Sequence, residues 1–198
     1  VFDLLKTAGA DRIMSVDLHA AQSQGFFDGP VDHLVAMPVL VDYIRDRFQG
    51  HLDNVAVVSP DAGRIRVAEQ WAQRLGGGPL AFVHKTRDIT RPNQAVANRV
   101  VGDVAGKDCV LVDDLIDTAG TIAGACHVLQ DAGAKSVTVV ATHGVLSGPA
   151  IERLKNCGAR EVVLTDTVPI PEEKRWDGLT VLSIAPLLAS AIRAVFEL

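Results

Sequence analysis

The stretch Val110-Leu-Val-Asp-Asp-Leu-Ile-Asp-Thr-Ala-Gly-Thr121 decides the fold and locates the site. An apolar run over residues 109–112 ends in carboxylates and small residues, and apolar side chains then recur at helical spacing over residues 122–129. The pattern predicts a buried strand, a junction over residues 113–120 and a helix. In an open α/β sheet, ligands bind at such a junction.

The residue types of this junction suit a phosphorylated sugar. The small and hydroxyl-bearing residues 118–121 let backbone N–H groups approach an anion at the positive end of the helix. Ionised Asp113 and Asp114 repel phosphate, so their natural partners are sugar hydroxyls or a metal ion. An isolated Asp-Asp pair is more simply an acidic helix cap. The full acidic and small-residue pattern favours the ligand site.

Further β-rich runs alternate with helical patterns along the chain. This alternation indicates βαβ units, and hence an α/β fold with a mostly parallel sheet flanked by helices. Amphipathic helices are expected over residues 39–48 and 65–75. The expected strands are Arg12–Val16, Val55–Ser59, Leu80–Val83, Cys109–Val112, Ser136–Ala141, Glu161–Leu164 and Leu179–Ile184.

Composition excludes several classes of protein. The formal charge is −5, and no basic cluster with interleaved aromatic residues is present, which argues against a nucleic-acid partner. No apolar run of about 18 residues and no signal peptide are present, so we expect no membrane association and a cytoplasmic location. Cys109, Cys126 and Cys157 lack metal-type spacing and are expected to be reduced structural thiols. The chain lacks an initiator Met and opens in a helix-like segment, so it is expected to be a fragment.

The acidic junction resembles the ribose 5-phosphate-binding motif of phosphoribosyltransferases and ribose-phosphate pyrophosphokinases. That motif alone does not separate the two families. The segment Asp17-Leu-His-Ala-Ala-Gln-Ser-Gln-Gly-Phe-Phe-Asp-Gly-Pro-Val-Asp32 resembles the pyrophosphokinase signature throughout its length. Similarity continues through residues 58–63, 85–87 and 141–144, so the resemblance to ribose-phosphate pyrophosphokinases covers essentially the whole chain.

The resemblance implies a particular organisation. Members of the family contain two tandem phosphoribosyltransferase-like domains and assemble as hexamers, so a homo-oligomer is expected. Residues 1–37 correspond to the end of the amino-terminal domain and residues 38–198 to the carboxy-terminal one. The family's adenine-binding elements precede the region covered here. The chain alone is therefore expected to bind ribose 5-phosphate weakly and to show no turnover.

The resemblance also implies the reaction and its residues. The substrates are ATP and ribose 5-phosphate, the cofactor is Mg²⁺, and the products are phosphoribosyl diphosphate and AMP. From the residues alone, Lys85 and Arg87 look like a solvated basic loop, but they match the family's catalytic loop. The implied assignments are Lys85 and Arg87 for catalysis; Arg87, Asp113, Asp114, Asp117, Thr118, Ala119, Gly120 and Thr121 for ribose 5-phosphate; and His19, Asp61 and Asp17 for the metal, with Asp28 and Asp32 as weaker candidates.

The sequence departs from the family pattern at two places. Arg64 replaces a second glycine after Gly63, where it is expected either to pair with phosphate or to cover the helix end. The stretch between Arg87 and Pro92 is slightly longer than in many relatives. Two alternatives remain open: a phosphoribosyltransferase, which consumes phosphoribosyl diphosphate, and an inactive regulatory subunit. The other histidines, His33, His51, His84, His127 and His143, are expected to be structural or surface residues.

Overall fold

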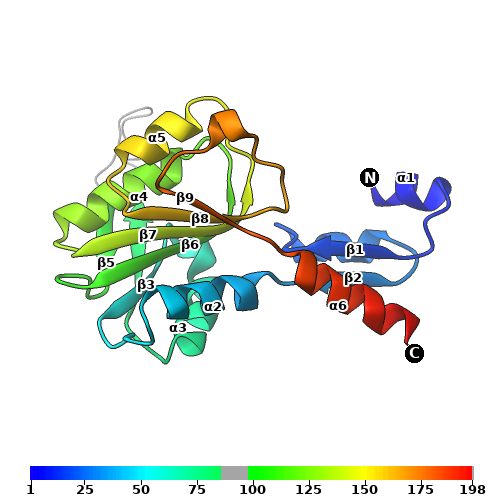
Figure 1. Cartoon of the computed structure of the whole chain (residues 1–198), viewed down its shortest axis with the longest axis horizontal. Coiled ribbons are helices and arrows are strands. Elements are labelled where there is room, and N and C mark those ends of the chain that lie inside the picture. Colours follow the sequence, from blue (N-terminus) through cyan, green and yellow to red (C-terminus); the bar gives the residue numbers. More distant parts are fainter. Residues whose placement is uncertain (86–97, 198) are drawn as a thin grey trace.

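A large twisted sheet forms the body of the molecule (Figure 1). The computed structural model describes residues 1–85 and 98–197. Its strands are β3 (Val55–Ser59), β4 (Leu80–Lys85), β5 (Asn98–Val101), β6 (Asp108–Ile116), β7 (Ser136–Gly144), β8 (Glu161–Thr165) and β9 (Leu179–Leu182). Within the described residues these seven strands lie in the order β5-β4-β3-β6-β7-β8-β9. Neighbours are parallel except β4 and β5, so the predicted α/β class is confirmed.

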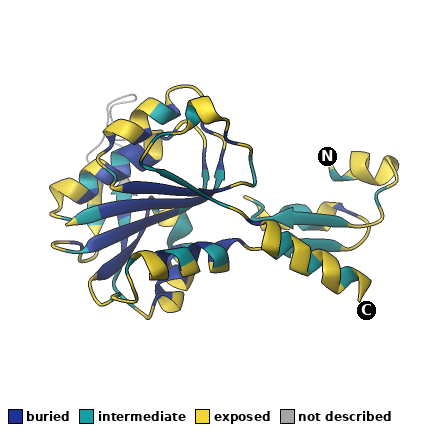
Figure 2. Ribbon diagram, in the orientation of Figure 1, coloured by how far each residue is buried: buried dark blue, intermediate teal, exposed yellow. Residues whose placement is uncertain are grey.

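Helices cover both faces of this sheet. In Figure 1, α2 (Met37–Arg47) and α3 (Ile65–Arg74) lie below it, and α4 (Gly120–Asp131) and α5 (Ala150–Asn156) lie above it. Successive side chains of a strand point to opposite faces, so an apolar strand such as β6 packs against both layers. Cys109 and Leu111 join the cluster under α4, whereas Val110 and Val112 join the cluster over α2 and α3. Figure 2 shows the resulting buried central strands.

A smaller sheet lies beside the large one. Its parallel strands are β1 (Ile13–Val16) and β2 (Val31–Leu34), preceded by α1 (Phe2–Thr7) and linked by the 3₁₀ helix η1 (Ala21–Phe26). The last helix, α6 (Ala185–Phe196), begins next to β1, since Val16 and Leu188 line one cavity. The chain end therefore returns to the first strands (Figure 1). The division into residues 1–37 and 38–198 stays a prediction.

The structure corrects several expected boundaries. Neither a strand nor a helix was expected between residues 17 and 38, but this stretch contains η1 and β2. The antiparallel strand β5 was not expected. Strand β6 was expected to end at Val112 but continues to Ile116, because its backbone pairs with β7 as far as Gly144. Short 3₁₀ helices, η2 (Ala62–Arg64) and η3 (Glu172–Lys174), complete the described elements.

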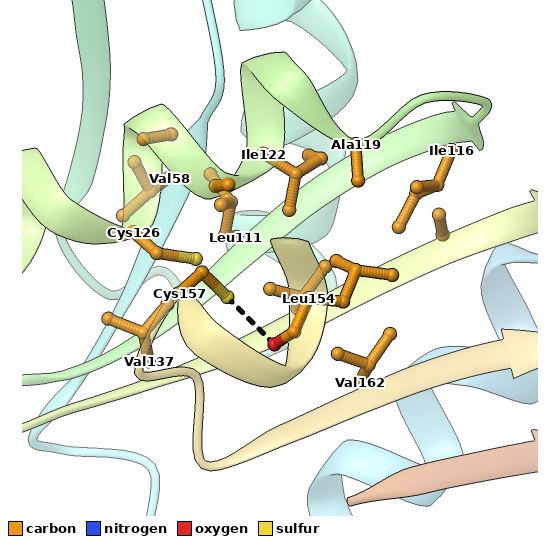
Figure 3. Packing of buried hydrophobic residues seen from close by; sticks show 14 of the residues in the cluster. Val58, Leu111, Ile116, Ala119, Ile122, Cys126, Val137, Leu154, Cys157 and Val162 are labelled. Atoms are coloured by element: carbon orange, nitrogen blue, oxygen red, sulfur yellow. Dashed lines mark hydrogen bonds between the residues drawn. The ribbon is translucent and has the colours of Figure 1, made fainter. Parts of the chain in front are cut away.

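No helix within residues 1–85 and 98–197 is long and apolar enough to cross a membrane. The three thiols are buried and free, as expected of structural cysteines. Figure 3 shows Cys126 and Cys157 packed between α4 and α5, where the Cys157 thiol donates to the Leu154 carbonyl at 3.2 Å. These residues form part of the apolar layer that supports the start of α4.

Candidate functional site

A cavity of about 240 Å³ lies at the carboxyl end of β6. Three segments that are distant in sequence meet there: the acidic end of β6 with the following loop, the turn before α3, and His19, which lies three residues after β1. This is the edge of a parallel sheet at which ligands bind. The structure brings together most of the predicted site residues. The cavity is lined by His19, Asp61, Arg64, Asp113, Asp114, Leu115, Ile116, Asp117, Thr118, Ala119, Gly120, Thr121 and Ile122.

The acidic pair belongs to the strand and not to the loop. Asp113 is paired in register with Ala141 of β7, and the pairing continues beyond it. The expected junction over residues 113–120 is therefore wrong in its first half. Neither aspartate caps α4, whose N-cap position is held by Ala119 without a side-chain hydrogen bond. The rigid strand holds both carboxylates at the cavity wall, which excludes the helix-cap interpretation.

A tight turn over residues 117–119 connects β6 to α4. Ala119 adopts the left-handed conformation, with φ 58° and ψ 11°, which costs energy for any residue with a Cβ and is concentrated at functional sites. Its methyl group is buried in the cluster under α4 (Figure 3), which supports the strained backbone. The helix then begins at Gly120 without a side-chain cap at Ala119, and the positive end of its dipole lies at the cavity, where it favours an anion.

Arg153 of α5 supports this turn from outside the cavity. Its Nη1 donates to the Thr118 carbonyl at 2.9 Å. Sequence patterns give no signal for Arg153, because it lies in a short helix 35 residues after Thr118. Its contact with the turn depends on the packing of α5 against α4.

The two carboxylates of the acidic pair ionise differently. Burial raises the pKa of Asp113 above its ordinary value, and the adjacent Asp114 adds to this effect. Burial also opposes ionisation of Asp114, but a hydrogen bond from Asp113 and the charge of Arg64 outweigh it and lower the pKa of Asp114. The pair therefore holds one firmly ionised carboxylate beside one that is more readily protonated.

Arg64 is a site residue whose contacts the sequence analysis did not predict. Its Nη2 lies 2.6 Å from Asp114 Oδ2 and 2.7 Å from His19 Nδ1, and its Nε lies 4.0 Å from Asp113 Oδ1. The backbone of Arg64 has φ −108° and ψ 10°, which does not require the glycine of the commoner family pattern. Arg64 therefore replaces that glycine without strain and reaches toward the acidic pair.

Asp17 and His19 are two residues apart, and both line a second cavity of about 400 Å³. Asp17 has a left-handed backbone with φ 44°, which breaks the alternation of an extended strand. The Asp17 carboxylate accepts hydrogen bonds from the Ala36 N–H at 3.0 Å and the Thr142 hydroxyl at 2.7 Å. His19 faces the cavity, with Nδ1 2.8 Å from Asp114 Oδ2. Asp17 thus joins the two sheets.

The other metal candidates differ in their environments. Asp61 lines the cavity, and its Oδ1 accepts the Gly63 N–H at 2.8 Å. Asp32 is held by Arg12, whose Nη2 donates to Oδ1 at 2.8 Å, and Asp28 is exposed. Within residues 1–85 and 98–197, no three His, Cys, Asp or Glu side chains gather as a complete metal site. Mg²⁺ usually keeps water and substrate phosphates as ligands, so one or two protein ligands suffice for it.

The predicted catalytic pair lies at the limit of the described chain. Lys85 is the last residue of β4, and its side chain lies outside the described residues, as does all of Arg87. Two of the remaining histidines are structural, as expected: His143 contacts Thr167 and the Asp17 carbonyl, and the Nε2 of His33 accepts the Leu18 N–H at 2.9 Å.

The chain is similar to known proteins over its whole length. Residues 84–198 match the family model of the phosphoribosyl synthetase-associated domain. "Ribose-phosphate pyrophosphokinase" of Mycobacterium bovis is 66% identical over 197 residues, and that of Corynebacterium efficiens is 65% identical over the same length. Both matches cover 100% of this chain and 60% of the relative.

A solved structure gives the same result. The crystal structure of phosphoribosylpyrophosphate synthetase from Mycobacterium smegmatis is 63% identical and superposes with a TM-score of 0.90. The match covers 99% of this chain and 62% of that structure. This chain therefore spans about 60% of the length of the proteins it resembles. On the family match over residues 84–198, the chain belongs to the phosphoribosyl synthetase-associated domain family.

Proposed function

We propose that the full-length protein containing this chain is a Mg²⁺-dependent ribose-phosphate diphosphokinase. It converts ATP and ribose 5-phosphate into phosphoribosyl diphosphate and AMP for nucleotide biosynthesis. One observation carries the proposal: the cavity at the end of β6 places two carboxylates beside an uncapped helix N-terminus. The proposal is supported by the similarity to the proteins named ribose-phosphate pyrophosphokinase in Mycobacterium bovis and Corynebacterium efficiens and to the phosphoribosylpyrophosphate synthetase of Mycobacterium smegmatis.

The two ends of the cavity suit the two ends of the sugar phosphate. The 5-phosphate accepts hydrogen bonds from the N–H groups of residues 117–121 and is stabilised by the dipole of α4. The ribose hydroxyls donate to Asp113 and Asp114, which lie in the rigid strand β6. Binding at both ends orients the anomeric hydroxyl away from α4.

The transfer makes one bond and breaks one bond. The anomeric oxygen bonds to the β-phosphorus of ATP, the bond from that phosphorus to the α–β bridging oxygen breaks, and AMP leaves with that oxygen. The hydroxyl proton is released. Such a reaction needs positioned cations around the transferring group, which is the role we assign to Lys85 and Arg87. When bound, Mg²⁺ neutralises part of the phosphate charge, and Asp61 and His19 are the residues that would hold it.

The reaction is tested by incubating the full-length protein with ATP, ribose 5-phosphate and MgCl₂ and measuring AMP by chromatography. We expect AMP and phosphoribosyl diphosphate in equal amounts. A phosphoribosyltransferase instead consumes phosphoribosyl diphosphate with a nucleobase and forms no AMP from ATP. An inactive regulatory subunit does neither. Absence of AMP from a folded protein would reject the proposal.

We expect Lys85→Ala to lower kcat by about 100-fold or more while KM for ribose 5-phosphate changes by less than about threefold, because a cation that acts on the transferring group stabilises only the transition state. Lys135→Ala is the matched control, since Lys135 lies before β7 at the opposite end of the sheet and is 64% exposed. Steady-state kinetics against both substrates provide the measurement. An equal loss in substrate affinity would contradict the role of Lys85.

The assembly and location are part of the same proposal. By resemblance to the family we propose a homo-oligomer, a hexamer in the full-length protein, and a cytoplasmic location. Light scattering of the full-length protein measures its mass in solution, and a monomer at assay concentration would contradict the assembly.

A further inference from the structure

Arg64 stands between two cavities of the site. It lines the cavity at the end of β6 and also a second cavity of about 400 Å³, whose walls include Leu18, Met37 and Trp71. Its side chain is 24% exposed, so the guanidinium is held largely within the protein. The three groups nearest to it in the cavity are His19, Asp113 and Asp114. Arg64 is therefore part of the wall that carries the acidic pair.

The contacts of Arg64 use one oxygen of Asp114. Arg64 Nη2 and His19 Nδ1 both approach Oδ2, at 2.6 and 2.8 Å. A guanidinium only donates, so its bond to the Asp114 carboxylate is charge-assisted. The hydrogen bonds of Arg64 and His19 to Asp114 both involve Oδ2, and neither involves Oδ1. Arg64 and His19 therefore leave the second oxygen of Asp114 for a ligand.

The contact with Arg64 constrains the Asp114 carboxylate and stabilises its charge beside Asp113. Asp113 and Asp114 are adjacent, and both have 15% exposed side chains, so two ionised carboxylates would repel each other strongly. The Arg64 charge beside Asp114 offsets that repulsion and fixes the direction of the carboxylate. A fixed acceptor loses less conformational entropy when it binds a hydroxyl than a mobile one.

We propose that Arg64 is a positioning residue for the sugar: it holds Asp114 so that the remaining oxygen accepts a ribose hydroxyl. The inference rests on the proposed function for the identity of the ligand. Arg64 acts on the ligand through Asp114 and does not contact the 5-phosphate, which binds at the start of α4. The alternatives are that Arg64 binds phosphate directly or only supports the turn before α3.

The test compares two ligands in the full-length protein without ATP, so that no turnover occurs. Calorimetric titration measures the Kd of ribose 5-phosphate and of inorganic phosphate, which has no hydroxyl for Asp114. We expect Arg64→Gly to raise the Kd of ribose 5-phosphate by about tenfold and that of inorganic phosphate by less than about twofold. Arg64→Lys should give an intermediate value, because a lysine restores the charge but not the planar geometry. Arg66→Ala, an exposed position two residues away, should change neither Kd.

Any other pattern of change in the two Kd values overturns the inference. An equal loss for both ligands means that Arg64 only supports the fold, and a larger loss for inorganic phosphate means that it binds the anion. If Arg64→Gly does not fold, as judged by circular dichroism, Arg64→Lys carries the same comparison with a smaller difference. A protein that binds ribose 5-phosphate with this dependence but forms no AMP would reject the proposed reaction and leave the inference standing. If the protein forms AMP and its Arg64→Gly variant binds ribose 5-phosphate normally, the proposed reaction stands and the inference about Arg64 is rejected.

Discussion

Strand β6 carries carboxylates near both ends, and their surroundings shift the pKa values of Asp108 and Asp113 in opposite directions. At its first residue, the Asp108 carboxylate accepts the Ser136 hydroxyl at 2.7 Å and Lys135 Nζ at 2.9 Å. Burial opposes ionisation, but these hydrogen bonds outweigh it and lower the pKa of Asp108. Near the other end, burial prevails and raises the pKa of Asp113. The same residue type is therefore fully paired at one end and only partly paired at the other.

The first residue of β8 repeats the pattern of the paired end. The Glu161 carboxylate accepts the Tyr43 hydroxyl at 2.5 Å, the Thr180 hydroxyl at 2.6 Å and Arg47 Nε at 3.0 Å. A carboxylate surrounded by donors supports folding, whereas one that lacks donors favours a ligand that brings them. A ribose hydroxyl is such a donor. We infer that the carboxylates at the amino end of the sheet stabilise the fold and that those at its carboxyl end bind the ligand.

The largest expected effect is on activity at the binding end. We expect Asp113→Asn to lower kcat/KM for ribose 5-phosphate by about 100-fold in the full-length protein, because a carboxyl group that binds a ribose hydroxyl is replaced by an amide. Asp108→Asn, on the same strand, is the matched control and should lower stability without changing kcat/KM. Steady-state assays of both variants provide the measurement. Similar activity losses in both would remove the distinction between the two ends.

The next effect is on stability at the paired end. Glu161→Ala leaves Tyr43, Thr180 and Arg47 without their shared acceptor, and we expect the free energy of unfolding to fall by about 2 kcal/mol. The expected loss in the free energy of unfolding is no larger because Arg47 is 38% exposed, so solvent replaces part of its interaction with Glu161. Urea denaturation followed by circular dichroism measures the change. An unaltered midpoint would contradict a stabilising role for this network.

A smaller effect is expected in the pH dependence of stability. Because the pKa of Asp113 is raised in the folded protein, the native state keeps a proton that the unfolded chain loses between about pH 4 and about pH 7. The contribution of Asp113 to stability is therefore present below this interval and is lost as the pH rises through it. We expect the stability of Asp113→Asn, relative to the unaltered protein, to increase as the pH rises from 4 to 8, because the substituted side chain has no proton to lose. Urea titrations at several pH values measure the difference in the free energy of unfolding between the two proteins. A difference that does not change with pH would show that the pKa of Asp113 is not raised.

The smallest effect concerns an exposed partner at the paired end. Lys135 is 64% exposed, so its interaction with Asp108 is screened by solvent. We expect Lys135→Ala to lower the free energy of unfolding by no more than about 0.5 kcal/mol, and the difference to disappear in high salt. Ser136→Ala should cost more, since it removes a 2.7 Å hydrogen bond from a carboxylate whose side chain is only 9% exposed. The reverse order would show that charge, and not burial, stabilises this end.

Much of the fold and part of the site could be predicted from the sequence. The apolar runs identified seven of the strands because buried parallel strands are continuous in hydrophobicity. Strands β2 and β5 are four residues each and carry polar side chains, so their pattern gave no such signal. The acidic and small-residue pattern identified the wall of the cavity. The end of β6 was misplaced because backbone pairing with β7, and not side-chain polarity, determines where the strand ends.

The contacts within the site depended on tertiary structure. Arg64 and Asp114 are 50 residues apart, and nothing local in the sequence connects them. The left-handed backbone of Asp17, a residue other than glycine, is not revealed by composition. Arg153 reaches Thr118 only because α5 packs on α4. Sequence patterns therefore located the site, while packing determined which side chains meet in it.

The antiparallel pair β4 and β5 has a consequence for how the protein tolerates change in length. Lys85 and Asn98 are register partners, so the chain leaves the sheet and returns to it at two neighbouring points. Both anchor points belong to the sheet, so we expect a change in the number of residues between them to leave the register of β4 and β5 and the acidic pair on β6 in place. Evolution can vary the segment that carries Arg87 independently of the sugar-binding wall.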